Sequence, residues 1–291
     1  ATAVTLFEGT ERELTGELLA PADPDAPYAI LIHGSGPSDL NESVGAVQPF
    51  RDLAYDLAEN GVGSLRFDKI TYTHPELGAD TVVQEYLEPV TEALRVLRAR
   101  LDGNRIYALG HSEGGMLMPW LVSECGFDGG AALAGTPKQL WEISYEQNLA
   151  ILPSLPEAQQ ASLQKDIEAE RARAESLQAL DDGETVFGLP AGYLKHMATL
   201  DELALAQSCE KPLLFLWGDA DFQVSREDFD AWREGLGDGE RFAYIVYPGL
   251  NHLFMPAQEG DGIASAAQVY ARPAQMDPGV ARDIAAWMNA D

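Results

Sequence analysis

The chain has 291 residues, of which 46% are hydrophobic and 23% charged, a composition typical of folded proteins rather than disordered ones. Its 47 acidic and 19 basic residues give a formal net charge of −28, which disfavours nucleic acid, anionic membranes and polyanionic ligands as partners. No apolar run approaches the ~20 residues that span a bilayer, and no signal sequence is evident at the start. We therefore expect a cytoplasmic protein, although a secreted protein with its signal peptide removed would look the same.

The first predicted elements are two strands, residues 3–9 and 13–20, whose pattern is typical of an antiparallel hairpin. Beyond them, short apolar runs alternate with amphipathic segments. The predicted strands are residues 28–34, 62–68, 105–110, 129–135, 212–218 and 241–249. The predicted helices are residues 49–61, 81–101 (kinked at Pro89), 113–124, 225–236 and 280–290. This alternation predicts an α/β fold, a mostly parallel sheet with crossover helices on both faces.

The alternation is interrupted between residue 136 and about residue 207. Within this segment, residues 154–182 predict one long helix, and Ser154 with Glu157 matches a capping box at its start. An apolar stripe, which Glu170 interrupts, is formed by Leu163, Ile167, Ala174, Leu177 and Leu180. We expect a core of residues 1–135 and 208–291, with residues 136–207 as a helical cap inserted after the sixth strand.

The stretch GHSEGG, residues 110–115, follows the predicted strand 105–110 and opens the helix 113–124. A serine flanked by glycines between a strand and a helix is typical of a nucleophile elbow, where the glycines prevent clashes between the two elements. A glycine-rich turn with a capping serine is the alternative. The position of Ser112 within the alternation favours the nucleophile.

A serine nucleophile needs a base and an acid that orients the base. Two carboxylates, Asp219 and Asp221, follow the strand 212–218, and Asp221 is favoured because it lies further past the strand end. His252 follows the strand 241–249, so the chain order is Ser, Asp, His, the order found in one large group of hydrolases. The other histidines lack this combination of position and order: His33, His74, His111 and His196.

Acyl transfer also needs backbone N–H groups aimed at the developing oxyanion. One is expected from Glu113, directly after the nucleophile, and the other from Ser35, in the stretch HGSGP after the strand 28–34. HGSGP is equally compatible with a tight turn in which His33 is bonded to a neighbouring loop.

The motifs HGSGP, FDK, GHSEGG, LWGDADFQV and YPGLNHLF together resemble the α/β-hydrolase superfamily. Within it they are similar to bacterial carboxylesterases with a GHSEGG elbow, near the serine aminopeptidases and prolyl-oligopeptidase-like hydrolases. The resemblance implies an eight-stranded sheet, a helical cap, a Ser112–His252–Asp221 triad, and no metal or organic cofactor. One departure concerns the FDK motif: relatives commonly continue with Arg-Gly-x-Gly, whereas this chain continues as ITYTHPELG, so the relatives' substrate preference is not carried over.

The expected reaction is hydrolysis of carboxylic esters of small to medium soluble molecules. The expected substrate-binding residues are Trp141, Tyr145, Tyr193, Phe222 and Phe254. An aminopeptidase or amidase is the alternative, and it would need acidic cap residues to hold a substrate ammonium; the candidates are Glu168, Glu170, Glu175, Asp181 and Asp182. A coenzyme A thioesterase is opposed by the net charge, and a non-catalytic receptor by the complete triad. The sequence does not indicate an oligomeric state.

The two cysteines have no Cys or His at metal-ligand spacing, so no zinc site is predicted. Cys125, near the end of the elbow helix, and Cys209, just before the strand 212–218, are both expected at the amino edge of the sheet, far from Ser112. The strands 129–135 and 212–218 are expected to be neighbours, because the insertion only interrupts their connection, so we expect the two thiols to lie close together. A disulfide there needs a Cα separation of ~4.4–6.8 Å. Two free thiols are the alternative.

Overall fold

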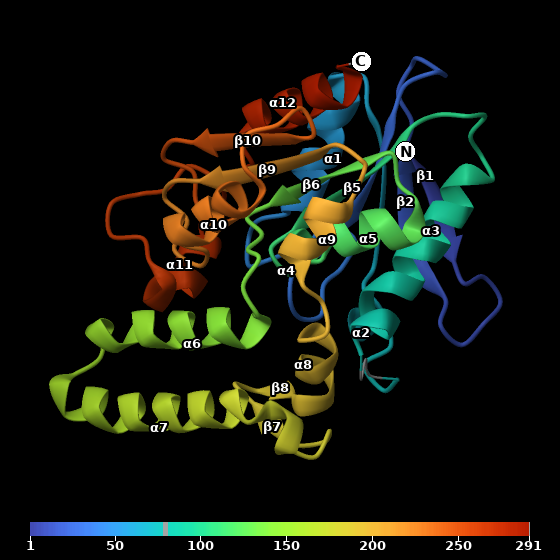
Figure 1. Cartoon of the computed structure of the whole chain (residues 1–291). Helices are drawn as coiled ribbons and strands as arrows, with labels where there is room; N and C mark the ends of the chain where they lie inside the picture. Colours follow the sequence, from blue (N-terminus) through green and yellow to red (C-terminus); the bar gives the residue numbers. More distant parts are fainter. Residues whose placement is uncertain (78–80, 291) are drawn as a thin grey trace.

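The computed structural model of the chain describes residues 1–77 and 81–290 (Figure 1). An eight-stranded sheet has the order β1-β2-β4-β3-β5-β6-β9-β10. Its strands are β1 Thr2–Leu6, β2 Leu14–Leu19, β3 Tyr28–Ile32, β4 Gly63–Phe67, β5 Ile106–His111, β6 Gly129–Leu133, β9 Leu213–Gly218 and β10 Phe242–Tyr247. Strand β2 is antiparallel to both β1 and β4, and all other neighbours are parallel. The predicted hairpin and mostly parallel sheet are confirmed.

Helices cover both faces of the sheet (Figure 1). On one face α1 (Pro49–Glu59) packs against α12 (Pro278–Asn289). On the other lie α3 (Glu88–Arg98), α5 (Met118–Cys125), α9 (Glu202–Ser208) and α10 (Arg226–Leu236). Strand β3 shows the division, because Ala29 and Leu31 pack toward α1 while Ile30 and Ile32 pack toward α3. Alternate side chains of a strand point to opposite faces, so both helical layers are anchored on this central strand.

The predicted helix 81–101 is broken near the predicted kink. Residues Val83–Leu87 form a π-helical segment, in which the Glu88 N–H donates to the Val83 carbonyl, and α3 follows with Pro89 in its first turn. A proline has no N–H to donate, and its ring crowds the carbonyl four residues earlier, so the wider π turn accommodates it.

The helix after the elbow is also divided. It consists of α4 (Glu113–Met116) and α5, joined at Leu117. Pro119, in the first turn of α5, cannot donate to the Gly115 carbonyl, which explains why the predicted continuous helix 113–124 is interrupted.

The inserted segment contains α6 (Leu140–Ile151), α7 (Glu157–Glu175), the two-residue strands β7 (Thr185–Val186) and β8 (Leu189–Pro190), and α8 (Ala191–Met197). Figure 1 shows α6, α7 and α8 outside the sheet layers, with α6 between α7 and the core. The prediction of one helix over residues 154–182 is wrong: α7 ends at Glu175, and a 3₁₀ turn, Leu177–Ala179, follows. The predicted Ser154 cap is also wrong, because Ser154 Oγ donates to the Ile151 carbonyl, and extended Pro156 immediately precedes the helix.

Several short elements complete the chain: α2 (Ile70–Thr73), α11 (Ala266–Tyr270), and the 3₁₀ turns Leu152–Ser154 and Ile263–Ser265. The segment ITYTHPELG begins with α2, and its last residue, Gly78, lies outside the described residues, as does Asp291 at the end of the predicted core. Among the helices of the described residues, none combines the length and apolar character needed to cross a membrane.

Both cysteine side chains are free thiols. Cys125 ends α5, Cys209 follows α9, and these two helices pack against each other. Strands β6 and β9 are parallel neighbours, as the argument for proximity required. The disulfide alternative is therefore not formed in this structure, and the Cα separation stays a prediction.

Candidate active site

Ser112 occupies a sharp turn between β5 and α4, with φ of 52° and ψ of −114°. A left-handed φ is costly for a residue with a side chain, so surrounding structure must impose it. A Cβ atom on Gly110 would lie 2.1 Å from the Gly114 carbonyl oxygen, and one on Gly114 would lie 2.5 Å from the Ile32 carbonyl oxygen. Glycine is thus required on either side of Ser112. This strand–turn–helix geometry is that of a nucleophile elbow.

His252 and Asp221 form a buried pair after β10 and β9. The distance from His252 Nδ1 to Asp221 Oδ2 is 2.7 Å, and both side chains are almost fully buried. Asp221 Oδ1 accepts hydrogen bonds from the backbone N–H groups of Gln223 and Val224, so its carboxylate is fixed in the turn after β9. Asp219 instead accepts a hydrogen bond from the Gly249 N–H and ties two loops together. Of the two competing carboxylates, the structure brings Asp221 to the histidine.

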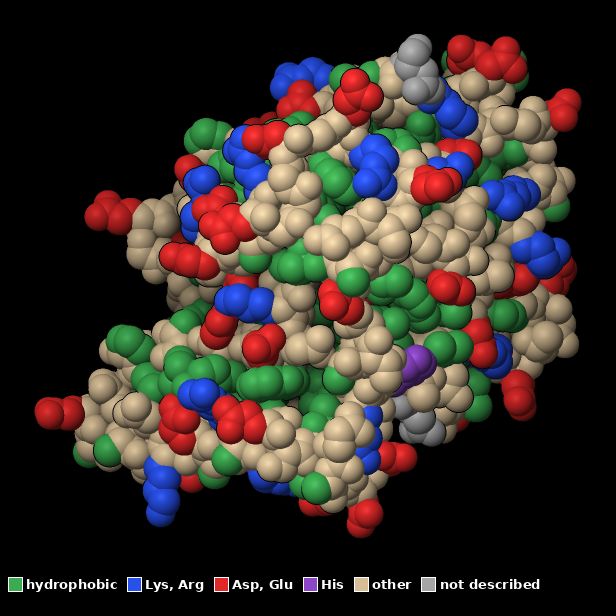
Figure 2. Space-filling view, viewed as in Figure 1, with side chains coloured by type: hydrophobic (Ala, Val, Ile, Leu, Met, Phe, Trp, Pro, Cys, Tyr) green, Lys and Arg blue, Asp and Glu red, His purple; other side chains and the backbone are tan. Residues whose placement is uncertain are grey.

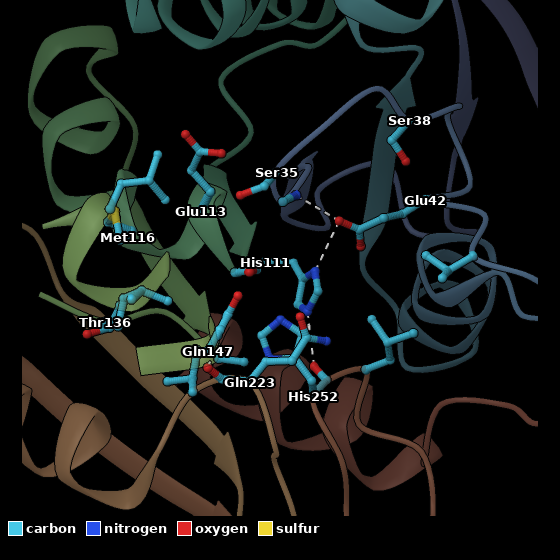
Figure 3. Close-up of a pocket in the computed structure, with 18 of the residues that line it drawn as sticks. Ser35, Ser38, Glu42, His111, Glu113, Met116, Thr136, Gln147, Gln223 and His252 are labelled. Atoms are coloured by element: carbon cyan, nitrogen blue, oxygen red, sulfur yellow. Dashed lines mark hydrogen bonds and ion pairs between the residues drawn. The ribbon is translucent and has the colours of Figure 1, made fainter. Parts of the chain in front are cut away.

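Ser112 and His252 line the same pocket, whose volume is about 400 Å³ (Figure 3). The core supplies the floor through the loop after β3, the elbow and the His252 loop. Helix α6 supplies one wall with Leu140, Ile143, Ser144 and Gln147, and the β7–β8 hairpin adds Phe187 and Leu189. The pocket therefore lies between the sheet and the inserted segment.

The two expected oxyanion donors, Ser35 and Glu113, both line this pocket (Figure 3). Among residues 1–77 and 81–290, no group accepts a hydrogen bond from the backbone N–H of either residue. Glu113 is buried and Ser35 is exposed at the pocket mouth, so two N–H groups without an acceptor face one pocket and are suited to a ligand oxygen.

Sequence reasoning missed a second buried acid–histidine pair. His111 Nδ1 lies 3.0 Å from Glu42 Oε1, and its Nε2 lies 3.0 Å from the His252 carbonyl oxygen (Figure 3). Glu42 Oε1 also accepts a hydrogen bond from the Gly34 N–H. The pair thus links the loop after β3 to the loop that carries His252. Its only sequence signal was the position of His111 inside the elbow, since nothing in the spacing pairs it with Glu42.

The pair is buried, and each member shifts the pKa of the other. Burial alone raises the pKa of Glu42, but the charge and hydrogen bond of His111 outweigh it and hold that pKa below its ordinary value. Burial alone lowers the pKa of His111, and the charge and hydrogen bond of Glu42 raise it above its ordinary value. His33, by contrast, has a pKa lowered to about 4, mainly by burial, and its Nε2 lies 2.9 Å from the Asp39 carbonyl oxygen. His33 is therefore bonded to a neighbouring loop, one of the two expectations for HGSGP.

Among the described residues, the pocket wall includes none of the five aromatic residues expected to bind substrate. Trp141 and Tyr145 lie on α6 but off the face formed by residues 140, 143, 144 and 147. Tyr193 donates its hydroxyl to Glu113 Oε1, and Phe222 packs against Tyr270. Phe254 is fully buried beneath the site. The sequence analysis predicted no helix over residues 140–151, so it had no basis for deciding which of these side chains would face the pocket.

Within the described residues, no group of three or more His, Cys, Asp or Glu side chains is placed to hold a metal ion.

A serine elbow at the carboxyl edge of a mostly parallel eight-stranded sheet, with a histidine and an aspartate from later strand ends, defines the α/β-hydrolase class. The chain has the α/β-hydrolase fold, and the proteins similar to it in sequence or structure include several esterases.

One similar curated protein is Esterase EstD of Thermotoga maritima, 32% identical over 281 residues, which are 96% of this chain and 66% of the relative. Among solved structures, Est1E from Butyrivibrio proteoclasticus has a TM-score of 0.58 at 17% identity, covering 93% of this chain and 96% of its own. The Pyrococcus furiosus esterase Pf2001 has a TM-score of 0.57 at 15% identity, covering 99% of this chain and 91% of its own. No family model matches. The chain thus spans just under two thirds of its curated relative.

Proposed function

We propose that the protein is a serine esterase that hydrolyses carboxylic esters of small to medium soluble molecules. The observation that carries this proposal is the strained Ser112 on the same pocket as the buried His252–Asp221 pair. The similarity to Esterase EstD supports esters rather than amides as the substrate class.

In the proposed reaction, Ser112 Oγ attacks the acyl carbon while its proton passes to His252 Nε2. Asp221 holds Nδ1, so the free Nε2 is the ring nitrogen that acts as base. The carbonyl oxygen becomes an oxyanion that accepts hydrogen bonds from the N–H groups of Ser35 and Glu113. The ester C–O bond then breaks, and His252 gives its proton to the departing alcohol. Water repeats the sequence on the acyl-enzyme and releases the acid.

We further propose that residues 136–207 act as a cap that sets substrate size. Support comes from α6 and the β7–β8 hairpin, which contribute Leu140, Ile143, Phe187 and Leu189 to the pocket wall. The final helix of this segment, α9, packs on α5 and α10 of the core, so the cap proper consists of α6 to α8.

The aminopeptidase alternative receives no support from the acidic residues of the cap. Glu170 is bonded to Arg173 and to the Phe187 N–H. Glu168 accepts a hydrogen bond from the Tyr145 hydroxyl, and Glu175 forms an ion pair with Arg171. These carboxylates are used within the cap, so no specific observation favours binding of a substrate ammonium there.

Steady-state rates on p-nitrophenyl esters, aminoacyl anilides and acyl-coenzyme A test the proposal most directly. We expect the esters to be hydrolysed fastest, and Ser112→Ala to abolish both hydrolysis and labelling by a fluorophosphonate probe. Higher kcat/KM on anilides would support the peptidase, and labelling that persists in Ser112→Ala would place the nucleophile elsewhere.

A further inference from the structure

The Ser35 N–H belongs to the same peptide unit as the Gly34 carbonyl, and that carbonyl has two buried donors. Gly34 O accepts a hydrogen bond from Lys69 Nζ at 2.8 Å and another from Tyr86 Oη at 2.9 Å. A peptide unit is planar, with its N–H and C=O pointing in opposite directions. Two donors that fix the carbonyl oxygen therefore also fix the direction of the Ser35 N–H at the other end.

Both donors are held by their own surroundings. Lys69 lies two residues after the end of β4, which pairs with β3, and its side chain reaches the loop after β3. Its Nζ also lies 2.8 Å from Tyr86 Oη and 2.8 Å from Glu85 Oε1, and the Lys69 side chain is 2% exposed. Tyr86 and Glu85 both come from the π-helical segment Val83–Leu87. The segment that Pro89 forces out of α-helical geometry thus supplies two of the groups around Lys69.

Tyr86 stays a donor over the working pH range. Burial, followed by the nearby carboxylate charge of Glu113, raises the pKa of Tyr86 well above its ordinary value. A neutral phenol can donate to the Gly34 carbonyl while accepting from Lys69. The two side chains therefore act on the carbonyl together.

The network also reaches the second oxyanion donor. The Glu113 carboxylate accepts a hydrogen bond from the Tyr193 hydroxyl at 2.7 Å, and Tyr193 lies on α8 of the inserted segment. The cap therefore holds Glu113, which carries one oxyanion N–H, through its side chain. Lys69 and Tyr86 hold the Gly34–Ser35 peptide, which carries the other.

We propose that Lys69 and Tyr86 are positioning residues for the oxyanion hole: they orient the Gly34–Ser35 peptide and strengthen its N–H as a donor. A donor on an amide oxygen polarises the amide, and the gain per bond in such chains is roughly 10–30%. A preorganised N–H needs no reorientation when the oxyanion forms, so the effect appears in the transition state. This inference rests on the proposed esterase function and deepens it.

The alternative is a purely structural role, in which Lys69 only neutralises buried Glu85. Three variants separate the two. Tyr86→Phe removes one donor and leaves the ion pair. Lys69→Met/Glu85→Gln removes the cationic donor without leaving a buried carboxylate unpaired. Lys211→Met is the control for loss of a lysine away from the site, because Lys211 is exposed just before β9. The double variant itself leaves the net charge unchanged, so a loss of activity in it does not arise from the overall charge.

The measurements are kcat and KM for a p-nitrophenyl ester, thermal stability, and Ki for a trifluoromethyl ketone whose serine adduct carries an oxyanion. We expect Lys69→Met/Glu85→Gln to lower kcat by roughly 10–100-fold, less than the loss of a whole oxyanion donor, with KM changed less than about twofold. The ketone Ki should rise by the same factor as kcat falls. Tyr86→Phe should lower kcat by about 3–10-fold, and Lys211→Met should leave all three constants unchanged.

The proposal is overturned if Tyr86→Phe and the double variant keep wild-type kcat while only thermal stability falls. It is also overturned if kcat falls but the ketone Ki does not, because the loss would then not arise at the oxyanion. Should the double variant fail to fold, unchanged kcat and Ki in Tyr86→Phe would overturn it. Failure of the esterase function itself appears in the wild type, as absent ester hydrolysis and absent fluorophosphonate labelling of Ser112.

Discussion

The backbone conformation of Ser112 determines how its hydroxyl is presented to the pocket. A φ of 52° places the Ser112 side chain at the apex of the turn rather than against β5 or α4. Gly110 and Gly114 allow the close approach of the two elements, and the positions on either side are closed to any larger residue. The strain is maintained by the sheet on one side and α4 on the other, as expected for a reactive serine.

The two aspartates after β9 provide a matched pair for testing the role of the acid. We expect Asp221→Asn to lower kcat by about 10³–10⁴-fold, because an amide at this position favours the wrong tautomer of His252. Asp219→Asn should change kcat far less, since Asp219 only bonds the Gly249 N–H. Initial rates on one ester at saturation decide the matter, and equal losses would contradict the assignment.

The Glu42–His111 pair should make stability depend on pH. The pKa of Glu42 lies below its ordinary value of 4.5, so its contribution is present above that value and is lost on acidification. The pKa of His111 lies above its ordinary value of 6.5, so its contribution is present below 6.5 and is lost as pH rises through the raised pKa. His33, Asp221 and the His252 carbonyl surround the pair and enter the same balance.

We expect the thermal stability advantage of the wild type over His111→Gln to be largest between about pH 5 and 6 and to shrink toward about pH 9. Melting temperatures of both proteins across this range provide the measurement. An advantage that stays constant or grows with pH would show that the ion pair is not its source.

At the scale of elements, the rotation of helix α6 decides which of its side chains line the pocket. Leu140, Ile143, Ser144 and Gln147 recur at helical spacing and line the pocket. Trp141 and Tyr145 project from other faces, and the Tyr145 hydroxyl is bonded to Glu168 at the surface. Under the proposed function, we therefore expect substrate preference to depend on the pocket-facing residues of α6 rather than on its aromatic residues.

We expect Ile143→Ala to enlarge the pocket and to raise kcat/KM for octanoate relative to acetate esters by about 3–10-fold, since pocket contacts of this size discriminate by such factors. The matched variant Trp141→Ala, on the same helix but off the wall, should leave the chain-length profile unchanged. The p-nitrophenyl esters of C2 to C10 acids provide the profile. A larger shift for Trp141→Ala would place the binding wall on the other face of α6.

The features that could be predicted depend on local sequence, whereas those that could not depend on contacts between distant parts of the chain. Strands, crossover helices and the elbow follow from local periodicity and glycine spacing, and these predicted the sheet and the positions of Ser112, Asp221 and His252. The Glu42–His111 pair and the Lys69 contact with Gly34 depend on which loops the finished sheet brings together. The start of α7 was misplaced because Pro156 competes locally with the Ser154 pattern. The spacing of residues along the sequence does not determine which distant loops come into contact in the folded protein.

At the scale of the whole molecule, the chain carries a formal net charge of −28. Within the described residues, the pocket wall includes no lysine or arginine. Figure 2 shows acidic side chains spread over both the core and the inserted segment on the face it presents. Lys69, whose Nζ bonds the Gly34 carbonyl behind the site, is buried and paired with Glu85. An anionic substrate therefore meets a repulsive field on approach and no compensating cation on the pocket wall.

This field predicts a salt dependence that distinguishes substrates by charge. We expect KM for an aryl acetate carrying a sulfonate to fall by about tenfold between 10 mM and 1 M NaCl, because the Debye length shortens from about 30 Å to about 3 Å. A neutral aryl acetate of the same size should change less than about twofold, and a trimethylammonium analogue should show the opposite trend. The rates are measured at the same pH for every salt concentration. A low, salt-independent KM for the sulfonate would mean that a cation reaches the bound substrate, and Lys138, beside the pocket residue Thr136 and bound to Glu146 and Asp228, would be the first lysine to substitute.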